Sequence, residues 1–204
     1  MKLFLINVAL ALSVLASCGQ TSSIGGACEG CEAIYESPVA FDELPFADSL
    51  PGFFETGAKL LIAGRVLTEK NQPLPNVVLY VYHTNTTGVY PTSGNDTGWV
   101  KRHGTLRGWL KTNEKGEYKF FTIRPGAYPG GDNPAHIHIT IKEKGKQEYW
   151  VDEFHFEDDA ALTEDVRKQF EERGGSGIIR VKKIDGILTG SRDIIAGKNI
   201  PGYQ

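Results

Sequence analysis

From Lys59 onward, short runs rich in valine, isoleucine, tyrosine and phenylalanine alternate with glycine, proline and asparagine turns. Runs of this length and composition, bounded by turn residues, are typical of β-strands. The Asn113–Gly116 segment has the composition of a hairpin turn between two such runs. The pattern predicts strands at residues 60–67, 77–84, 106–112, 117–123, 135–142, 148–156, 178–184 and 187–195.

Only residues 162–173 combine a helical pattern with a stop signal, Gly174-Gly175. Many short strands with regularly spaced turns are typical of a β-sandwich. Residues 59–204 are therefore predicted to be all-β, an antiparallel β-sandwich with one short C-terminal helix. Residues 33–58 carry three prolines and several phenylalanines, and they are expected to form an extended arm that packs on this domain.

The N-terminus is typical of a targeting segment. A positive start is followed by an apolar stretch, Leu3–Leu15, that is too short to span a bilayer. Leu15-Ala16-Ser17-Cys18 then resembles a bacterial lipobox, in which the cysteine is acylated. We expect residues 1–17 to be a signal peptide and residues 18–32 a lipidated, flexible tether. A lipid on Cys18 would anchor the protein to a membrane of the bacterial cell envelope, on its periplasmic or outer surface; an ordinary signal peptide with a stray cysteine is the alternative.

Composition narrows the possible classes. The chain has 204 residues, enough for one globular domain with a sizeable core. Lys and Arg number 22 against 25 Asp and Glu, a formal net charge of −3, so no electrostatic nucleic-acid partner is expected. After residue 17 no stretch is apolar enough to cross a bilayer, which argues against a multi-span membrane protein. The oligomeric state is not predicted.

Cys28 and Cys31 form a C-x-x-C pair in the tether. Such a pair can be redox-active, half of a metal site or a local disulfide. A four-cysteine zinc site is excluded because there is only one pair, and no βαβ pattern supports a thioredoxin-like role. Outside the cytoplasm a local disulfide is the favoured interpretation.

Candidate chemistry begins at His136-Ile137-His138. In a strand, residues i and i+2 point to the same face, so the two imidazoles can converge on one metal ion. A surface strand with two histidines would have the same sequence, and this alternative is open from the pattern alone. Two tyrosines lie on Gly- and Pro-containing loops near these strands, Tyr90 after the second strand and Tyr128 before the histidine strand.

Together these residues resemble the intradiol ring-cleavage dioxygenase family. The resemblance covers residues 59 to about 156, and the order and spacing of its motifs agree. The matching motifs are Gly64-Arg65-Val66, Gly88-Val89-Tyr90, Arg107-Gly108-Trp109, Gly116-Glu117-Tyr118-Lys119-Phe120, Thr122-Ile123-Arg124-Pro125-Gly126-Ala127-Tyr128-Pro129 and Pro134-Ala135-His136-Ile137-His138.

The resemblance implies a mononuclear Fe(3+) ion held by Tyr90, Tyr128, His136 and His138. The pKa of a free tyrosine phenol is ~10, so phenolate ligands require a strongly polarising cation. Anionic oxygen ligands also suit a hard trivalent ion. The implied reaction inserts both atoms of O2 into a catechol-type aromatic and gives a muconate-type diacid. Tyr128 matches the axial tyrosinate, which the substrate displaces and which takes up a proton.

Two positions depart from the family pattern. Asn133 stands where active members commonly carry arginine, and the loss of one charged stabiliser can lower a rate by about 10²–10³. Glu153 stands where a glutamine is often found, and the uncertain register makes Asp152 the alternative. Both positions are candidate catalytic residues together with Tyr128. They also motivate a second hypothesis, an iron-containing lipoprotein that binds catecholates without turnover.

Overall fold

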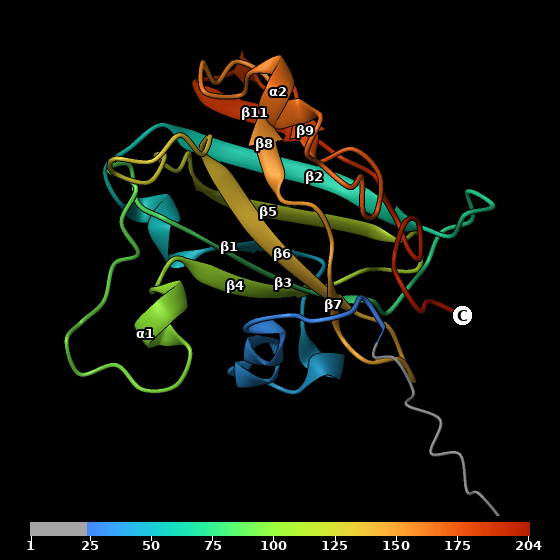
Figure 1. The fold of residues 1–204 in the computed structure, drawn as a ribbon. Coiled ribbons are helices and arrows are strands. Elements are labelled where there is room, and N and C mark those ends of the chain that lie inside the picture. Colours follow the sequence, from blue (N-terminus) through green and yellow to red (C-terminus); the bar gives the residue numbers. More distant parts are fainter. Residues whose placement is uncertain (1–23) are drawn as a thin grey trace, which may run out of the picture.

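The strands form two sheets of six strands each, which a computed structural model describes for residues 24–204 (Figure 1). The predicted signal peptide, Cys18 and the first part of the tether lie outside the described residues. In the first sheet, β2 (Lys59–Leu67) and β5 (Glu117–Ile123) form an antiparallel pair. The other members of this sheet are β1 (Ala47–Ser49), β10 (Lys182–Ile184), β11 (Ile187–Ser191) and β12 (Ile194–Ile195).

The second sheet carries the histidine strand. Its centre is β3 (Val78–His83), which pairs antiparallel with β4 (Arg107–Lys111) on one side and β6 (His136–Lys142) on the other. The register of β3 and β6 places Tyr82 opposite His138. Shorter strands extend this sheet beyond β6, namely β7 (Tyr149–Trp150), β8 (Phe154–Phe156) and β9 (Ile178–Ile179).

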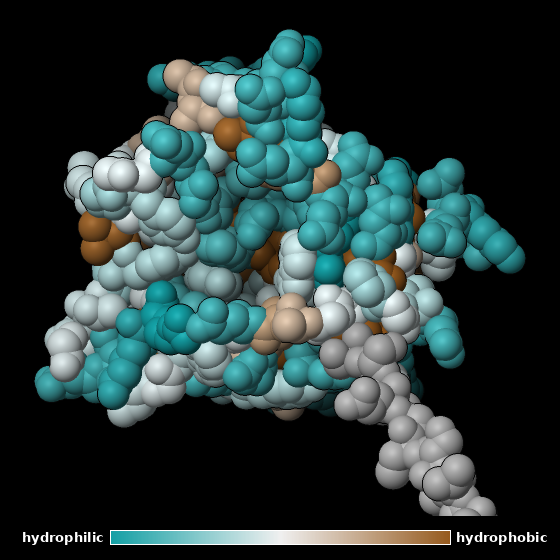
Figure 2. Space-filling model, viewed as in Figure 1, coloured by the Kyte–Doolittle hydropathy of each residue, from teal (hydrophilic) through white to brown (hydrophobic). Residues whose placement is uncertain are grey.

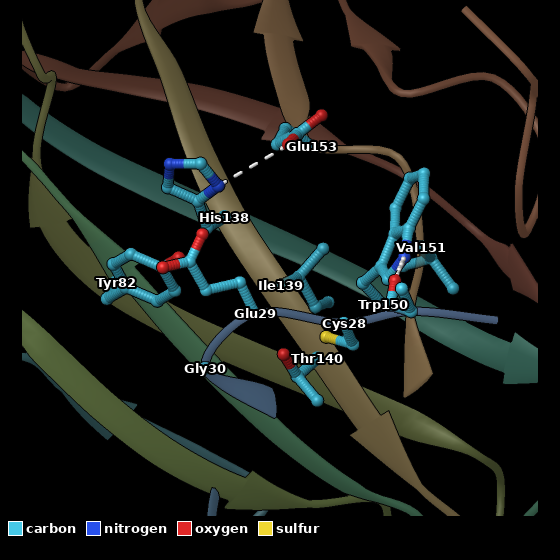
Figure 3. A pocket seen from close by; sticks show the side chains of 11 residues that line it. Cys28, Glu29, Gly30, Tyr82, His138, Ile139, Thr140, Trp150, Val151 and Glu153 are labelled. Atoms are coloured by element: carbon cyan, nitrogen blue, oxygen red, sulfur yellow. Dashed lines mark hydrogen bonds and ion pairs between the residues drawn. The ribbon is translucent and has the colours of Figure 1, made fainter. Parts of the chain in front are cut away.

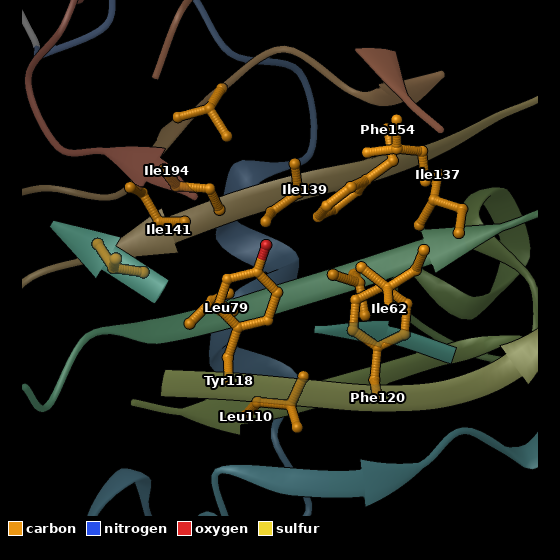
Figure 4. Close-up of a cluster of buried hydrophobic side chains, with 14 of the residues drawn as sticks. Ile62, Leu79, Leu110, Tyr118, Phe120, Ile137, Ile139, Ile141, Phe154 and Ile194 are labelled. Atoms are coloured by element: carbon orange, nitrogen blue, oxygen red, sulfur yellow. The ribbon is translucent and has the colours of Figure 1, made fainter. Parts of the chain in front are cut away.

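The core lies between the two sheets, as in a sandwich. Alternate residues of β6 enter it, and Figure 4 shows Ile137, Ile139 and Ile141 pointing from β6 toward the facing sheet. Phe120 of β5 and Phe154 of β8 meet there edge to face, with ring centroids 5.8 Å apart. Because side chains alternate along a strand, burying the isoleucines directs His136 and His138 to the opposite face of β6.

The prediction of an all-β sandwich is confirmed, and the two sheets are mixed. The central pairs are antiparallel, while β1–β5, β2–β11, β2–β12 and β8–β9 are parallel. Parallel neighbours require a long connection between the paired strands. Long segments separate each of these pairs along the chain, so short hairpin turns do not fix their direction.

The C-terminal helix is shorter than the predicted 162–173. Helix α2 covers Glu164–Arg167 and is capped by the Thr163 hydroxyl, which accepts from the Val166 N–H at 3.3 Å. Beyond it, the Asp152 carboxylate accepts hydrogen bonds from the backbone N–H groups of Glu172 (2.9 Å) and Arg173. These tertiary bonds draw residues 172–173 toward the sheet and outweigh the helical pattern.

Residues 33–58, predicted to be an extended arm, contain 3-10 turns as well as β1. These turns are η1 (Cys31–Glu36), η2 (Phe41–Glu43) and η3 (Pro51–Phe54). Ile34 of η1 is fully buried against Val78 and Tyr80 of β3. Cys31, the first residue of η1, is joined to Cys28 in a disulfide, which closes the loop between them.

The surface of the described part gives no sign of a membrane span. Among residues 24–204, no helix combines the length and hydrophobicity that crossing a bilayer requires. The face seen in Figure 2 is largely hydrophilic, and its hydrophobic residues form small, separate patches.

One more helical turn, α1 (Val100–His103), lies on the loop between β3 and β4, where no helix is predicted.

Candidate metal centre

Four side chains singled out in the sequence converge on one point beside β6. His136 and His138 lie on this strand, Tyr90 on the loop after β3 and Tyr128 on the loop before β6. The Nε2 atoms of the two histidines are 3.1 Å apart, and the Tyr128 hydroxyl oxygen is 3.2 Å from each. The Tyr90 hydroxyl oxygen is 2.5 Å from that of Tyr128. Two phenol oxygens and two imidazole nitrogens therefore surround one small volume.

The two tyrosine loops are held against each other by their backbones. The Gly126 N–H donates to the Asn85 carbonyl at 2.9 Å. Gly88 has a φ of 78°, and a Cβ at this position would lie 1.8 Å from the carbonyl oxygen of Ala127. Only glycine allows this approach, so the glycines beside both tyrosines have a structural role in bringing the hydroxyls together.

Each histidine is oriented by an acceptor at its Nδ1 atom. The Nδ1 atom of His136 lies 2.8 Å from the Pro134 carbonyl, which can only accept, so this nitrogen carries the proton. The Nδ1 atom of His138 lies 3.4 Å from the Glu153 carboxylate, which favours the same tautomer. Both Nε2 atoms then direct lone pairs toward the common point, as metal ligands do.

Burial sets the protonation states that a cation would meet. Desolvation, with a smaller contribution from His138, lowers the pKa of His136 to about 4, so this imidazole is neutral at neutral pH. Desolvation also raises the pKa values of Tyr90 and Tyr128, so both phenols keep their protons unless a cation replaces them.

The donor set fits a ferric ion. Two neutral imidazole lone pairs facing each other at 3.1 Å repel, and a cation between them removes this repulsion. Two phenol oxygens supply the hard, anionic donors that a trivalent ion prefers. No group of three or more His, Cys, Asp or Glu side chains in residues 24–204 is arranged to hold a metal, so the fit depends on the two tyrosines.

Two cavities open onto the donors. The smaller, about 200 Å³, is lined by three of the four donors. The larger, about 400 Å³, runs from His138 along β6 to Glu153 and residues 27–30 (Figure 3). The two cavities share Glu29, Tyr82 and His138. The larger cavity falls within the range of small-molecule sites, about 300–1,000 Å³.

Tyr82 is the aromatic wall common to both cavities. Its ring stacks between two imidazoles, 3.8 Å from the ring centroid of His103 and 4.5 Å from that of His138. The Tyr80 hydroxyl in turn lies 2.9 Å from the Nδ1 atom of His103. Because Tyr82 lies opposite His138 in the β3–β6 pair, this stack fixes the plane of the His138 ring from the neighbouring strand.

The structure places Glu153, rather than the alternative Asp152, at the site. The Glu153 carboxylate lies between His138 and His155, whose Nε2 atom is 3.7 Å away. Burial tends to raise the pKa of Glu153, but the contacts with His138 and His155 outweigh it and lower the pKa. Asp152 is buried and accepts the backbone N–H groups already described.

Asn133 is not brought to the four donors. It is exposed on the loop that precedes β6, and within residues 24–204 its side chain makes no hydrogen bond. Its catalytic role, and the assignment of the four donors as metal ligands, stay predictions.

Sequence reasoning missed two charged residues that line these cavities, Glu29 and Arg102. They form an ion pair with each other across the mouth of the site. Glu29 lies inside the C-x-x-C pair, and Arg102 lies in the long loop before β4. No local pattern relates these positions to the histidine strand, because their proximity arises only in the folded chain.

Replacing Glu153 by Gln is expected to weaken Fe(III) binding about tenfold, because a neutral amide supports the Nδ1–H group of His138 less well than a carboxylate does. Competition with a chelator of known affinity checks this. Glu157→Gln is the control, since Glu157 is exposed and pairs with Arg180. Equal affinities of the Glu153→Gln variant and the unchanged chain would show that the carboxylate does not support His138.

Gly30→Ala is expected to lower stability by about 1–3 kcal/mol more than Gly26→Ala does. Both glycines have positive φ, but a Cβ at Gly30 would lie 2.7 Å from the Nε2 atom of His103, whereas a Cβ at Gly26 meets nothing within 4 Å. Thermal unfolding of the two variants isolates the steric effect. Equal melting temperatures would mean that the disulfide loop is not packed on His103.

Known sequences match the domain that carries this site. A family model described as Dioxygenase matches residues 37–174, more than half of the chain. The protocatechuate 3,4-dioxygenase beta chain of Burkholderia cepacia is 32% identical over 99 residues, which cover 42% of this chain and 39% of that protein. Catechol 1,2-dioxygenase of Acinetobacter baylyi is 29% identical over 105 residues, covering 44% and 33%. The match thus spans well under half of either relative.

Solved structures share the fold. The dioxygenase domain of a dioxygenase carbohydrate-binding protein fusion from Streptomyces sp. SirexAA-E superposes with a TM-score of 0.58 at 24% identity, covering 72% of this chain and 84% of that one. For 3-chlorocatechol 1,2-dioxygenase from Rhodococcus opacus 1CP the TM-score is 0.56 at 22% identity, covering 72% and 62%. At these identities the likeness concerns the fold alone.

Proposed function

Because the chain belongs to the intradiol ring-cleavage dioxygenase family, we propose that it is a non-haem Fe(III) dioxygenase acting on a catechol-type aromatic. The proposed reaction inserts both atoms of O2 and yields a muconate-type diacid. The observation that carries the proposal is the convergence of two tyrosine hydroxyls and two histidine Nε2 atoms. Neighbouring donor atoms in this group are 2.5–3.2 Å apart.

Tyr90, Tyr128, His136 and His138 would hold the ion. When bound, Fe(III) would act as a Lewis acid and a template that draws electron density from a coordinated catecholate. Two phenolates would offset two of its three positive charges, so a dianionic catecholate finds a site of low net charge. The His136 imidazole stays neutral at neutral pH, because burial lowers its pKa to about 4.

Tyr128 is the residue placed to move a proton. Its hydroxyl oxygen is within hydrogen-bond reach of Tyr90 and within 3.2 Å of both histidine nitrogens, and it lines the smaller cavity. Burial raises the pKa of its free phenol, so Tyr128 would keep a proton that it has taken from an incoming catechol hydroxyl.

Product analysis under ¹⁸O2 tests this function. The expected product is a diacid that carries both labelled atoms. An aldehyde-containing product, or oxidation to a quinone without incorporation of oxygen, would contradict intradiol cleavage.

A second function, catecholate binding without turnover, is favoured by two observations. Asn133 is exposed and uncharged at the position where the family pattern has arginine. The Glu153 carboxylate also lines the larger cavity, where it opposes negative charge on a bound ring. A catechol-dependent colour change without oxygen consumption would select this alternative.

We further propose that a lipid on Cys18 anchors the protein in the cell envelope, on the support of the lipobox motif. The full chain carrying Cys18→Ser is expected to move from the membrane fraction to the soluble fraction of the envelope. Retention of this variant in the membrane fraction would contradict lipid anchoring.

A further inference from the structure

The N-terminal segment forms a fixed wall of the larger cavity. Residues 27–30 line it, and the Cys28–Cys31 disulfide closes this loop. The Trp150 indole N–H donates to the Ala27 carbonyl at 3.3 Å. Further back, the Gly25 N–H donates to the Pro201 carbonyl at 2.7 Å. The disulfide and these two hydrogen bonds therefore hold the backbone of the loop that carries Glu29.

The charged groups that line this cavity have one sign. In the part of the chain that the structure describes, the acidic and basic residues that line the cavity are Glu29 and Glu153, and both are carboxylates. Glu153 lies on one side of His138 and Glu29 near Tyr82 on the other (Figure 3). No lysine or arginine of residues 24–204 lines this cavity, so a carboxylate on a ligand would find no cationic side chain among these lining residues.

Arg102, which lines the smaller cavity, pairs with Glu29. The side chains of Arg102 and Glu29 are 61% and 72% exposed. Exposed pairs of this kind contribute little free energy, so Glu29 can exchange this partner for a cation on a ligand.

We propose that the larger cavity selects catechols whose ring substituent carries a protonated amine over catechols that carry a carboxylate, with Glu29 as the specificity-determining residue. The proposal rests on the proposed function, because the ring must first bind at the four donors. A substituent on that ring can extend past His138 and Tyr82 into the larger cavity, since both residues line the two cavities. There it meets Glu29 and Glu153.

The test is an anaerobic titration of the Fe(III)-loaded full chain with three catechols of similar size. The visible absorption of the complex reports binding. The probes are 4-(2-aminoethyl)catechol, neutral 4-ethylcatechol and 3,4-dihydroxyphenylacetate. We expect the amine to bind more tightly than the carboxylate. Glu29→Gln should reduce the ratio of the carboxylate's dissociation constant to the amine's dissociation constant about threefold to tenfold. The dissociation constant of 4-ethylcatechol should stay unchanged within about twofold.

Two further variants separate this effect from general charge. Glu32→Gln, which removes an exposed carboxylate that does not line either cavity, should leave the ratio unchanged. Arg102→Gln frees Glu29 and should increase the preference for the amine. High salt should reduce the preference in the unchanged chain, because screening weakens attraction between exposed charges.

The outcomes distinguish the two levels of inference. If 4-ethylcatechol binds with a colour change but the amine and the carboxylate bind equally, or if Glu29→Gln leaves their ratio unchanged, the specificity proposal is overturned and the proposed function stands. If 4-ethylcatechol does not bind the iron-loaded protein, the proposed function fails and the specificity proposal fails with it.

Discussion

A chain in which both Tyr90 and Tyr128 are replaced by Phe is expected to bind Fe(III) at least about a hundredfold more weakly than the unchanged chain, and to lose its visible colour. Replacing a residue that only supports a metal ligand already weakens metal binding about 10–100-fold. Here two proposed ligands are removed. The remaining donors are two neutral imidazoles, which are poor partners for a hard trivalent ion. The colour that we expect from charge transfer between phenolate and iron would disappear with the two phenolates.

Chelator competition and the visible spectrum measure the two effects separately. Tyr35→Phe is the matched control, because Tyr35 is 53% exposed and bonds Glu148. The control should keep both affinity and colour. Either single variant at the site should retain part of the colour, since one phenolate remains. Full affinity in the double variant would show that the tyrosines are not ligands.

Ile137→Ala is expected to destabilise the protein by about 2–5 kcal/mol and to weaken Fe(III) binding at the same time. Ile137 is fully buried and lies between His136 and His138 on β6, where its side chain fills the core beneath them. Truncation leaves a cavity under the strand, so the two imidazoles lose the packing that fixes their separation.

Thermal unfolding without metal measures the first effect, and the loss corresponds to a fall in melting temperature of about 10 °C for a domain of this size. Ile137→Val should cost only about 1 kcal/mol. Ile184→Ala, at a side chain 54% exposed, should change stability by less than about 0.5 kcal/mol. An Ile137→Ala variant as stable as the Ile184→Ala control would contradict the packing described here.

The strand pattern predicts much of this fold because alternate positions of the longer strands β2, β5 and β6 are buried. The alternation of His136, Ile137 and His138 is enough to place both imidazoles on one face, whatever the rest of the chain does. The pairing of Tyr90 with Tyr128 is different. It requires two loops to meet through Gly88 and Gly126, and the resemblance to a family, rather than the spacing, indicated it.

Features that depend on tertiary contacts could not be predicted. The helical pattern of residues 162–173 yields one turn, because Asp152 binds the backbone at Glu172 and Arg173 instead. Glu29 lies more than a hundred positions from His138 in the sequence, and it reaches the site only because the disulfide loop packs against Trp150 and His103. Contacts between residues so far apart in the chain leave no local sequence pattern.

The most direct test of the central claim is the visible spectrum of the purified, Fe(III)-loaded chain, recorded with a catechol first without O2 and then with O2 while oxygen consumption is followed. We predict a charge-transfer band that shifts when the catechol binds and decays as oxygen is consumed. A folded, iron-treated protein without any such band would contradict the four-donor centre. A shifted band that persists without oxygen consumption would contradict the dioxygenase activity and leave a catecholate-binding site.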